Sequence, residues 1–255
     1  MPTRKRTLGV SERFLVGTAL YEAGHAEAAL EQFGQVLERH PSTDAVSVAA
    51  GETLLSLRRY AEAAETVSEG RSGAGLEAGW RTELFARVAG GDLEGAATAL
   101  DAARAAGLPH PDCALFAAWL RLAGGVEPGG RSVGPLPSSA GDLLAVVLEA
   151  LLRVEEIDHF AMLAPLVETV GLPWRDRREL LAGMYLRRGY LESAADEWIE
   201  VCETAGPDVP ALIGLAKVAL AQGLDEEALM LADEIQALEP AHPAAARLRD
   251  ALDPD

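Results

Sequence analysis

The sequence predicts an all-α protein, a solenoid of about six stacked helix–turn–helix pairs with capping helices. The first reason is a repeat at a spacing of 34 residues, which relates Gly17 to Gly51 and Ala29 to Ala63. The second is that apolar residues recur at helical spacing within each repeat, without the alternation typical of strands. A repeat of this length that holds two helices predicts a stack in which neighbouring pairs share one apolar core.

The first repeat shows why each of its elements should form. Gly17 is a small residue on the first helix, and Gly24 permits the tight turn that follows it. Ala29 lets the axes of the two helices approach to about 8–9 Å, and Phe33 packs behind it. Pro41 stops the second helix, because proline cannot continue a helix. These residues predict one complete helical hairpin.

Later repeats carry the same packing pattern with variations. In the second repeat Arg58 stands where the turn glycine is expected. A weaker repeat, from about Asp142 to Pro173, has no turn glycine and has Pro165 inside its second helix. The predicted packing positions of the later repeats are Gly51, Ala63, Gly91, Ala96, Gly189, Ala194, Trp198, Gly223 and Ala228.

This pattern resembles the tetratricopeptide repeat, a helix–turn–helix unit of 34 residues. The resemblance implies that the first helix of each pair lines a concave, protein-binding face. Family members that bind a C-terminal carboxylate do so with Lys and Asn, and neither residue occurs at the matching positions here. The lining instead suits an extended or helical peptide with apolar anchors. The predicted groove residues are Phe14, Thr18, Tyr21, Val48, Glu52, Leu55, Arg81, Phe85 and Val88.

A second resemblance covers a shorter stretch. Residues 177–198 are similar to the repeat tails that follow the catalytic domains of bacterial family-2 glycosyltransferases. The sugar-nucleotide fold of such a domain has no counterpart in this sequence. If the kinship holds, it implies a non-catalytic accessory module for a glycosyltransferase or a cell-envelope enzyme.

The segment 124–141 divides the sequence. Twelve of its 18 residues are Gly, Pro or Ser, so it predicts a linker between an array at 1–123 and an array at 142–255. Each array ends in an unpaired helix, at Asp112–Leu122 and at about Ala244–Leu252, which we expect to cap it. The alternative is one continuous superhelix from which residues 124–141 project as a loop.

Charge and hydropathy restrict the partners and the location. The net charge of −18, from 40 acidic and 22 basic residues, disfavours nucleic acids and anionic membranes as partners. The longest apolar run, Cys113–Leu120, is far shorter than the roughly 20 residues that span a bilayer. We therefore expect a cytoplasmic protein in which Cys113 and Cys202 are free thiols, with a disulfide left open.

The candidate catalytic and metal-binding motifs in the sequence are better explained without a catalytic or metal-binding role. The segment 130–134 matches the Gly-x-Ser-x-Gly nucleophile elbow, but it lies among prolines and glycines and lacks the strand that the elbow requires. The five histidines are not at metal-ligand spacing, and the sequence contains no Cys-x-x-Cys and no Gly–Lys pair. Arg175, Arg177 and Arg178, with Arg187 and Arg188, are interleaved with acidic residues and predict an ion-paired helix surface, with a site for an acidic ligand as the alternative.

The sequence therefore predicts a scaffold or adaptor that is not an enzyme and needs no metal or cofactor. We expect its partner to be a protein or peptide in the concave groove. A homo-oligomer, in which the groove residues pack against a neighbouring subunit, is the alternative that the residues leave open.

Overall fold

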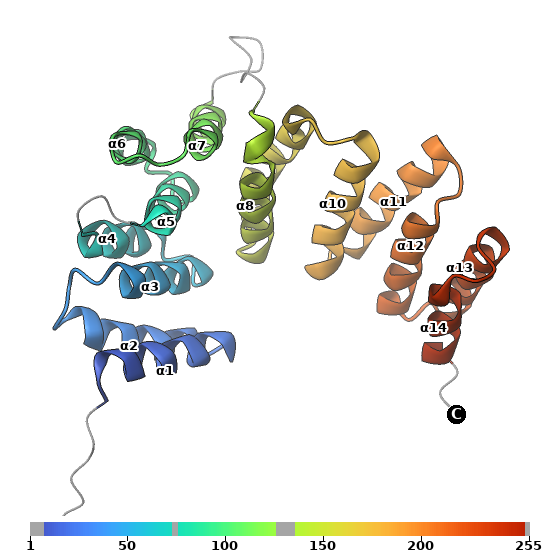
Figure 1. Ribbon diagram of the computed structural model, residues 1–255, viewed down its shortest axis with the longest axis horizontal. Helices are drawn as coiled ribbons and strands as arrows, with labels where there is room; N and C mark the ends of the chain where they lie inside the picture. Colours follow the sequence, from blue (N-terminus) through green and yellow to red (C-terminus); the bar gives the residue numbers. More distant parts are fainter. Residues whose placement is uncertain (1–7, 73–75, 126–135, 253–255) are drawn as a thin grey trace, which may run out of the picture. The chain divides into compact units, whose positions relative to one another are not determined.

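The structure is a computed structural model that describes residues 8–72, 76–125 and 136–252. Within these residues every regular element is a helix, namely fourteen α-helices and two short 3-10 helices, and no strand occurs (Figure 1). The predicted all-α class and helical-hairpin solenoid are confirmed. The chain forms two compact units, unit 1 at Met1–Val170 and unit 2 at Gly171–Asp255.

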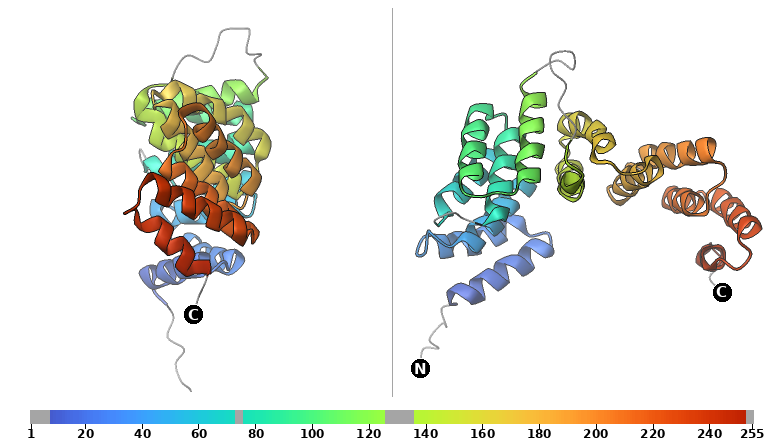
Figure 2. Two further views of the ribbon diagram at one scale, coloured as in Figure 1. Left: turned by 90° about the vertical axis from the view of Figure 1, so that its right-hand side faces the viewer. Right: turned by 45° about the horizontal axis from the view of Figure 1, so that its top comes forward.

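Unit 1 begins with three helical hairpins, α1/α2, α3/α4 and α5/α6, each of which packs against the next (Figure 2). The single helix α7 follows, and a less regular hairpin of α8 and α9 completes the unit. The helices are α1 (Val10–Glu22), α2 (Ala26–Leu37), α3 (Asp44–Ser56), α4 (Tyr60–Gly70), α5 (Glu77–Ala89), α6 (Leu93–Ala105), α7 (His110–Ala123), η1 (Ser138–Ala140), α8 (Gly141–Arg153), α9 (Ile157–Leu163) and η2 (Ala164–Val170).

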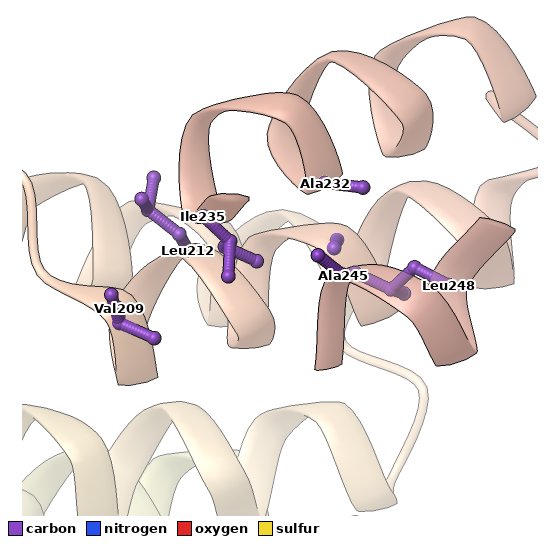
Figure 3. Packing of buried hydrophobic residues seen from close by; sticks show 7 residues of the cluster. Val209, Leu212, Ala232, Ile235, Ala245 and Leu248 are labelled. Carbon is purple, nitrogen blue, oxygen red and sulfur yellow. The ribbon is translucent and has the colours of Figure 1, made fainter. Parts of the chain in front are cut away.

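Unit 2 contains two further hairpins and a terminal helix. The hairpins α10/α11 and α12/α13 stack on each other, and α14 packs against α13. Figure 3 shows how apolar side chains of α12, α13 and α14 meet, so α14 covers the last apolar face of this unit as the sequence predicts. The helices are α10 (Trp174–Arg187), α11 (Leu191–Ala205), α12 (Val209–Gln222), α13 (Asp225–Leu238) and α14 (Pro243–Leu252).

Small residues set the distance between the helices of each regular hairpin. In each of these hairpins an alanine lies four residues after the N-cap of the second helix, and it has no exposed surface. These alanines are Ala29, Ala63, Ala96, Ala194 and Ala228. Glycine on the first helix has the same role in unit 1. A Cβ added at Gly17 would lie 2.5 Å from the ring of Phe33, and one added at Gly51 would lie 2.4 Å from Val67. Neither position has room for a side chain.

The tight turns use the left-handed backbone conformation. Gly24 and its equivalents Gly91, Gly189 and Gly223 all have positive φ, which glycine adopts without strain. Arg58 occupies the equivalent position between α3 and α4 with φ of 58°, and Glu155 does so between α8 and α9. The hairpins predicted without a turn glycine therefore form with the same turn.

The α8/α9 hairpin departs from the repeat at its crossing position. Phe160 lies four residues after the N-cap Glu156, where the other hairpins carry alanine. Its ring is buried, and α9 has only seven residues where the second helices of the other hairpins have eleven or more. The second helix is also broken, because α9 ends at Leu163 and Pro165 lies in the 3-10 helix η2 that follows.

The boundary between the units differs from the one that the linker composition predicts. Much of the segment 124–141 lies outside the described residues, and the described helices that follow it pack within unit 1. Helices α9 and η1 both pack against α7. Its buried Trp119 donates a hydrogen bond from Nε1 to Nδ1 of His159 on α9, at 3.1 Å. The division into compact units therefore follows Val170.

The crossing alanines generate the first prediction. Ala63 on α4 has no exposed surface, whereas Ala61 on the same helix is exposed. Ala63→Leu should lower the free energy of unfolding by about 1–3 kcal/mol, because added methylenes overpack a filled core. Ala61→Leu is the matched control and should change it little. Urea denaturation followed by circular dichroism measures both, and equal effects would contradict the assigned helix crossing.

The position of α7 generates the second prediction. A fragment of residues 1–123 exposes the face of Trp119 that α9 covers in unit 1. Compared with a fragment of residues 1–170, it should lose about 2 kcal/mol or more of unfolding free energy, the scale of exposing one large apolar side chain. Denaturation of the two fragments checks this, and equal stability would instead favour an array that ends at 123.

Candidate functional site

Unit 1 contains a pocket of about 630 Å³ between α8 and the helices α1, α3, α5 and α7. We name this pocket the α8 groove. All the helices on its inner side except α7 are first helices of hairpins, so it lies on the face where the family resemblance places a groove. The lining residues are Tyr21, Glu52, Leu55, Ala78, Arg81, Thr82, Phe85, Asp112, Phe116, Ser139, Asp142, Leu143, Val146, Val147, Ala150 and Arg153.

The floor of the α8 groove is continuous with the core. Phe85 is only 5% exposed, and its ring meets Trp119 edge-on with the centroids 5.2 Å apart. Phe116 is buried beside the same tryptophan. On the opposite wall the side chain of Val146 is 65% exposed. The groove therefore combines a rigid aromatic floor with an apolar side chain that solvent reaches.

An ion pair connects two of the inner helices at one end of the groove. Nε of Arg81 on α5 donates to Asp112 on α7 at 2.6 Å, and the same guanidinium bonds Glu77 at 3.0 Å. Asp112 is buried, so its carboxylate needs this partner. Arg81 and Asp112 neutralise each other and serve to hold α5 against α7.

A second charged pair lies across the groove. Glu52 on α3 keeps an exposed edge, yet the surrounding helices desolvate its carboxyl and raise its pKa. The positive charge of Arg153 on α8 acts in the opposite direction and lowers that pKa, but by less than desolvation raises it. Glu52 is thus a carboxylate whose environment only partly compensates its charge.

The turn after α8 is tied to the turn after α3. Glu156 accepts a hydrogen bond from Nη2 of Arg58 at 2.8 Å and another from the hydroxyl of Tyr60 at 2.7 Å. Burial is the main cause that raises the pKa of Tyr60, and the carboxylate of Glu156 adds to it. These contacts join residues nearly a hundred positions apart and hold α8 over the groove.

Five of the nine predicted groove residues line the α8 groove, namely Tyr21, Glu52, Leu55, Arg81 and Phe85. The other four lie elsewhere. Phe14 packs against Phe33, and the hydroxyl of Thr18 donates to the carbonyl of Phe14. Val48 and Val88 are buried in the core, as are Leu55 and Phe85. These four side chains therefore expose little surface to a partner, and their role in binding stays a prediction.

The wall formed by α8 was not predicted. The composition of residues 124–141 predicts that 142–153 belong to a separate array, so Val146, Arg153 and their neighbours are not among the predicted groove residues. No residue pattern within α8 distinguishes a helix that stacks in its own array from one that faces α3 and α5. Only the packing of α9 against α7 places this wall.

Two other pockets are weaker candidates for a binding site. One of about 470 Å³ beside α4, α5 and α6 is lined by the ion-paired residues Arg71, Glu83, Arg87 and Asp92. Glu83 is buried and bonded by both Arg71 and Arg87, so the charge of its carboxylate is compensated within the cluster. The other, of about 510 Å³, lies between α10, α11 and α12 in unit 2, over Trp198.

The arginines at the start of α10 are ion-paired, which confirms the sequence prediction for them. Arg175 bonds both carboxylate oxygens of Asp208, at 3.1 and 2.7 Å, and Arg178 bonds Glu197 and Glu200. Asp208 also caps α12 by accepting from the backbone N–H of Ala211. The bond from Arg175 is the main cause that lowers the pKa of Asp208. This charge holds α10 to α12.

Other candidate sites find no support in the part of the chain that the structure describes. No three His, Cys, Asp or Glu residues there lie close enough together to hold a metal ion. The Gly-x-Ser-x-Gly motif at 130–134 lies outside the described residues. Among the described helices, none has the length and apolar content needed to cross a bilayer.

Comparisons with known proteins agree with the repeat assignment. The sequence profile of the tetratricopeptide repeat family matches residues 15–75, a segment that begins within α1 and includes α2, α3 and α4. The comparison with curated proteins finds no match.

The comparison with solved structures finds matches at low identity. A thermophilic TPR protein of Thermus thermophilus is 20% identical, with 83% of this chain and 100% of that chain covered and a TM-score of 0.40. A tetratricopeptide repeat protein from Parabacteroides merdae is 14% identical, with 95% of this chain and 98% of that chain covered and a TM-score of 0.42. Neither transfers a partner or an activity to this chain.

The floor of the groove generates the third prediction. Phe85→Ser should lower the unfolding free energy by about 3–5 kcal/mol, because it removes a buried ring that packs on Trp119. Tyr21→Ser changes a half-buried groove residue, so it should lower the unfolding free energy by clearly less than Phe85→Ser does. Chemical denaturation measures both variants. Equally small losses of unfolding free energy in the two variants would indicate that Phe85 belongs to the groove surface and not to the core.

Proposed function

We propose that unit 1 is a protein-interaction module that binds a segment of a partner protein in the α8 groove. The observation that supports this most is the groove itself, about 630 Å³ in volume, with the exposed Val146 on one wall. Its volume is within the range of pockets that bind ligands, about 300–1,000 Å³. Its lining is largely apolar with a few charged groups, which is how sites of this kind obtain both affinity and orientation.

The supports of the groove favour a preformed site. Helices α3, α5 and α7 hold the floor, and the ion pair of Arg81 with Asp112 fixes two of them. Glu156 holds the far wall by its bonds to Arg58 and Tyr60. A partner segment therefore meets a surface whose side chains already have their positions, which lowers the entropic cost of binding.

An arginine at Val146 tests the proposal. Val146 is largely exposed on α8, so Val146→Arg should leave the fold intact while it blocks the groove and adds a charge to it. Affinity capture from the native host, followed by mass spectrometry, should recover partners with the wild-type protein and lose them with this variant. Met230→Arg, on the equally exposed surface of α13 in unit 2, is the matched control. Partners captured equally by all three proteins would overturn the proposal.

An accessory role beside a glycosyltransferase or a cell-envelope enzyme is the alternative that residues 177–198 suggest. These residues form most of the α10/α11 hairpin in unit 2. The same capture experiment separates the two functions, since a partner recovered through unit 2 should survive Val146→Arg.

A further inference from the structure

We propose that the segment bound in the α8 groove carries an arginine or lysine beside its apolar anchors, and that Glu52 binds this cation. The inference rests on the proposed function and names the class of partner for the same site. It commits to a basic, apolar peptide segment of another protein.

The charges that line the groove do not balance. Arg81 and Asp112 form a bonded pair and cancel. What remains is Glu52 on one side and Asp142 and Arg153 on the α8 side, so two carboxylates face one guanidinium. A cationic side chain from a partner would complete this arrangement, whereas an acidic segment would add to the excess of negative charge.

Glu52 is the carboxylate best placed to receive that cation. It lies on α3 one turn before Leu55, and both line the groove together with Tyr21. Desolvation raises the pKa of Glu52 more than Arg153 lowers it, so a further positive charge would stabilise the ionised form. The ring of Tyr21 offers a second favourable contact, because a cation over an aromatic face is attracted to it.

The apolar lining explains why charge alone does not define the partner. Leu55, Val146 and the aromatic floor offer surface that an apolar anchor covers, which supplies most of the affinity. The cationic side chain of the partner then distinguishes its segment from apolar segments that lack a positive charge. The net charge of −18 favours the same class of partner, because it attracts basic segments at long range and repels acidic ones.

Three labelled peptides test the inference by fluorescence anisotropy with the full-length protein. They share leucine and phenylalanine anchors, and their polar positions are all arginine, all glutamine or all glutamate. The arginine peptide should bind most tightly and lose its binding with Val146→Arg. Glu52→Gln should weaken it about tenfold, which corresponds to about 1.4 kcal/mol.

Glu65→Gln is the matched control, because it removes the same charge from an exposed position on α4 that does not line the groove. The control should leave the affinity for the arginine peptide nearly unchanged. Circular dichroism melting of each variant verifies that it folds. Glu52→Arg should reverse the order, so that the glutamate peptide binds more tightly than the arginine peptide.

Three results would overturn the inference. The first is an arginine peptide that does not bind, or that binds equally well to Val146→Arg. The second is an equal loss for Glu52→Gln and Glu65→Gln, since it would indicate attraction by net charge alone. The third is a glutamine peptide that binds the groove as tightly as the arginine peptide. This third result would leave the proposed function intact, which the capture of partners with Val146→Arg decides separately.

Discussion

The distance between two paired helices is the constraint on which this protein depends. A hairpin buries its apolar faces only where one helix carries alanine or glycine at the crossing, because a larger residue would hold the axes apart. Ala29 and Ala194 meet this condition with no exposed surface, one in each unit. A glycine opposite a large ring completes it within the first hairpin at Gly17, whose neighbour is Phe33. Gly214 on α12 allows the same close approach between neighbouring hairpins, because its neighbour is Trp198 on α11.

The exception to this constraint explains the groove. Phe160 occupies the crossing position of the α8/α9 hairpin, and Pro165 prevents its second helix from continuing as an α-helix. The short helix α9 packs against both α8 and α7. Helix α8 is then held over α3 and α5 by the contacts of Glu156 at its end, and the α8 groove lies beneath it. A loss of regularity in the repeat thus creates the concave pocket.

Ion pairs between a first helix and the next helix but one along the chain supplement the apolar packing. Arg81 bonds Asp112 from α5 to α7 in unit 1, and Arg175 bonds Asp208 from α10 to α12 in unit 2. In both pairs the acid lies at or near the start of its helix, where a negative charge is favourable to the helix dipole. The arginines of this acidic chain therefore serve largely in its own packing, and Glu52 remains among the carboxylates that they compensate only in part.

The sequence by itself determined the repeat, the regular hairpins and most of the packing positions. It did so because crossing alanines and turn glycines act locally, within about one turn of helix, and so leave a readable pattern in residues such as Ala63 and Gly189. It also predicted Tyr21 and Glu52 as groove residues from their places on first helices, and both line the α8 groove. Only the tertiary structure decided that Phe85 is core and that α8 belongs to unit 1. Both facts depend on contacts between segments far apart in the chain, Phe85 with Trp119 and Arg58 with Glu156, and such contacts leave no local periodicity in the sequence.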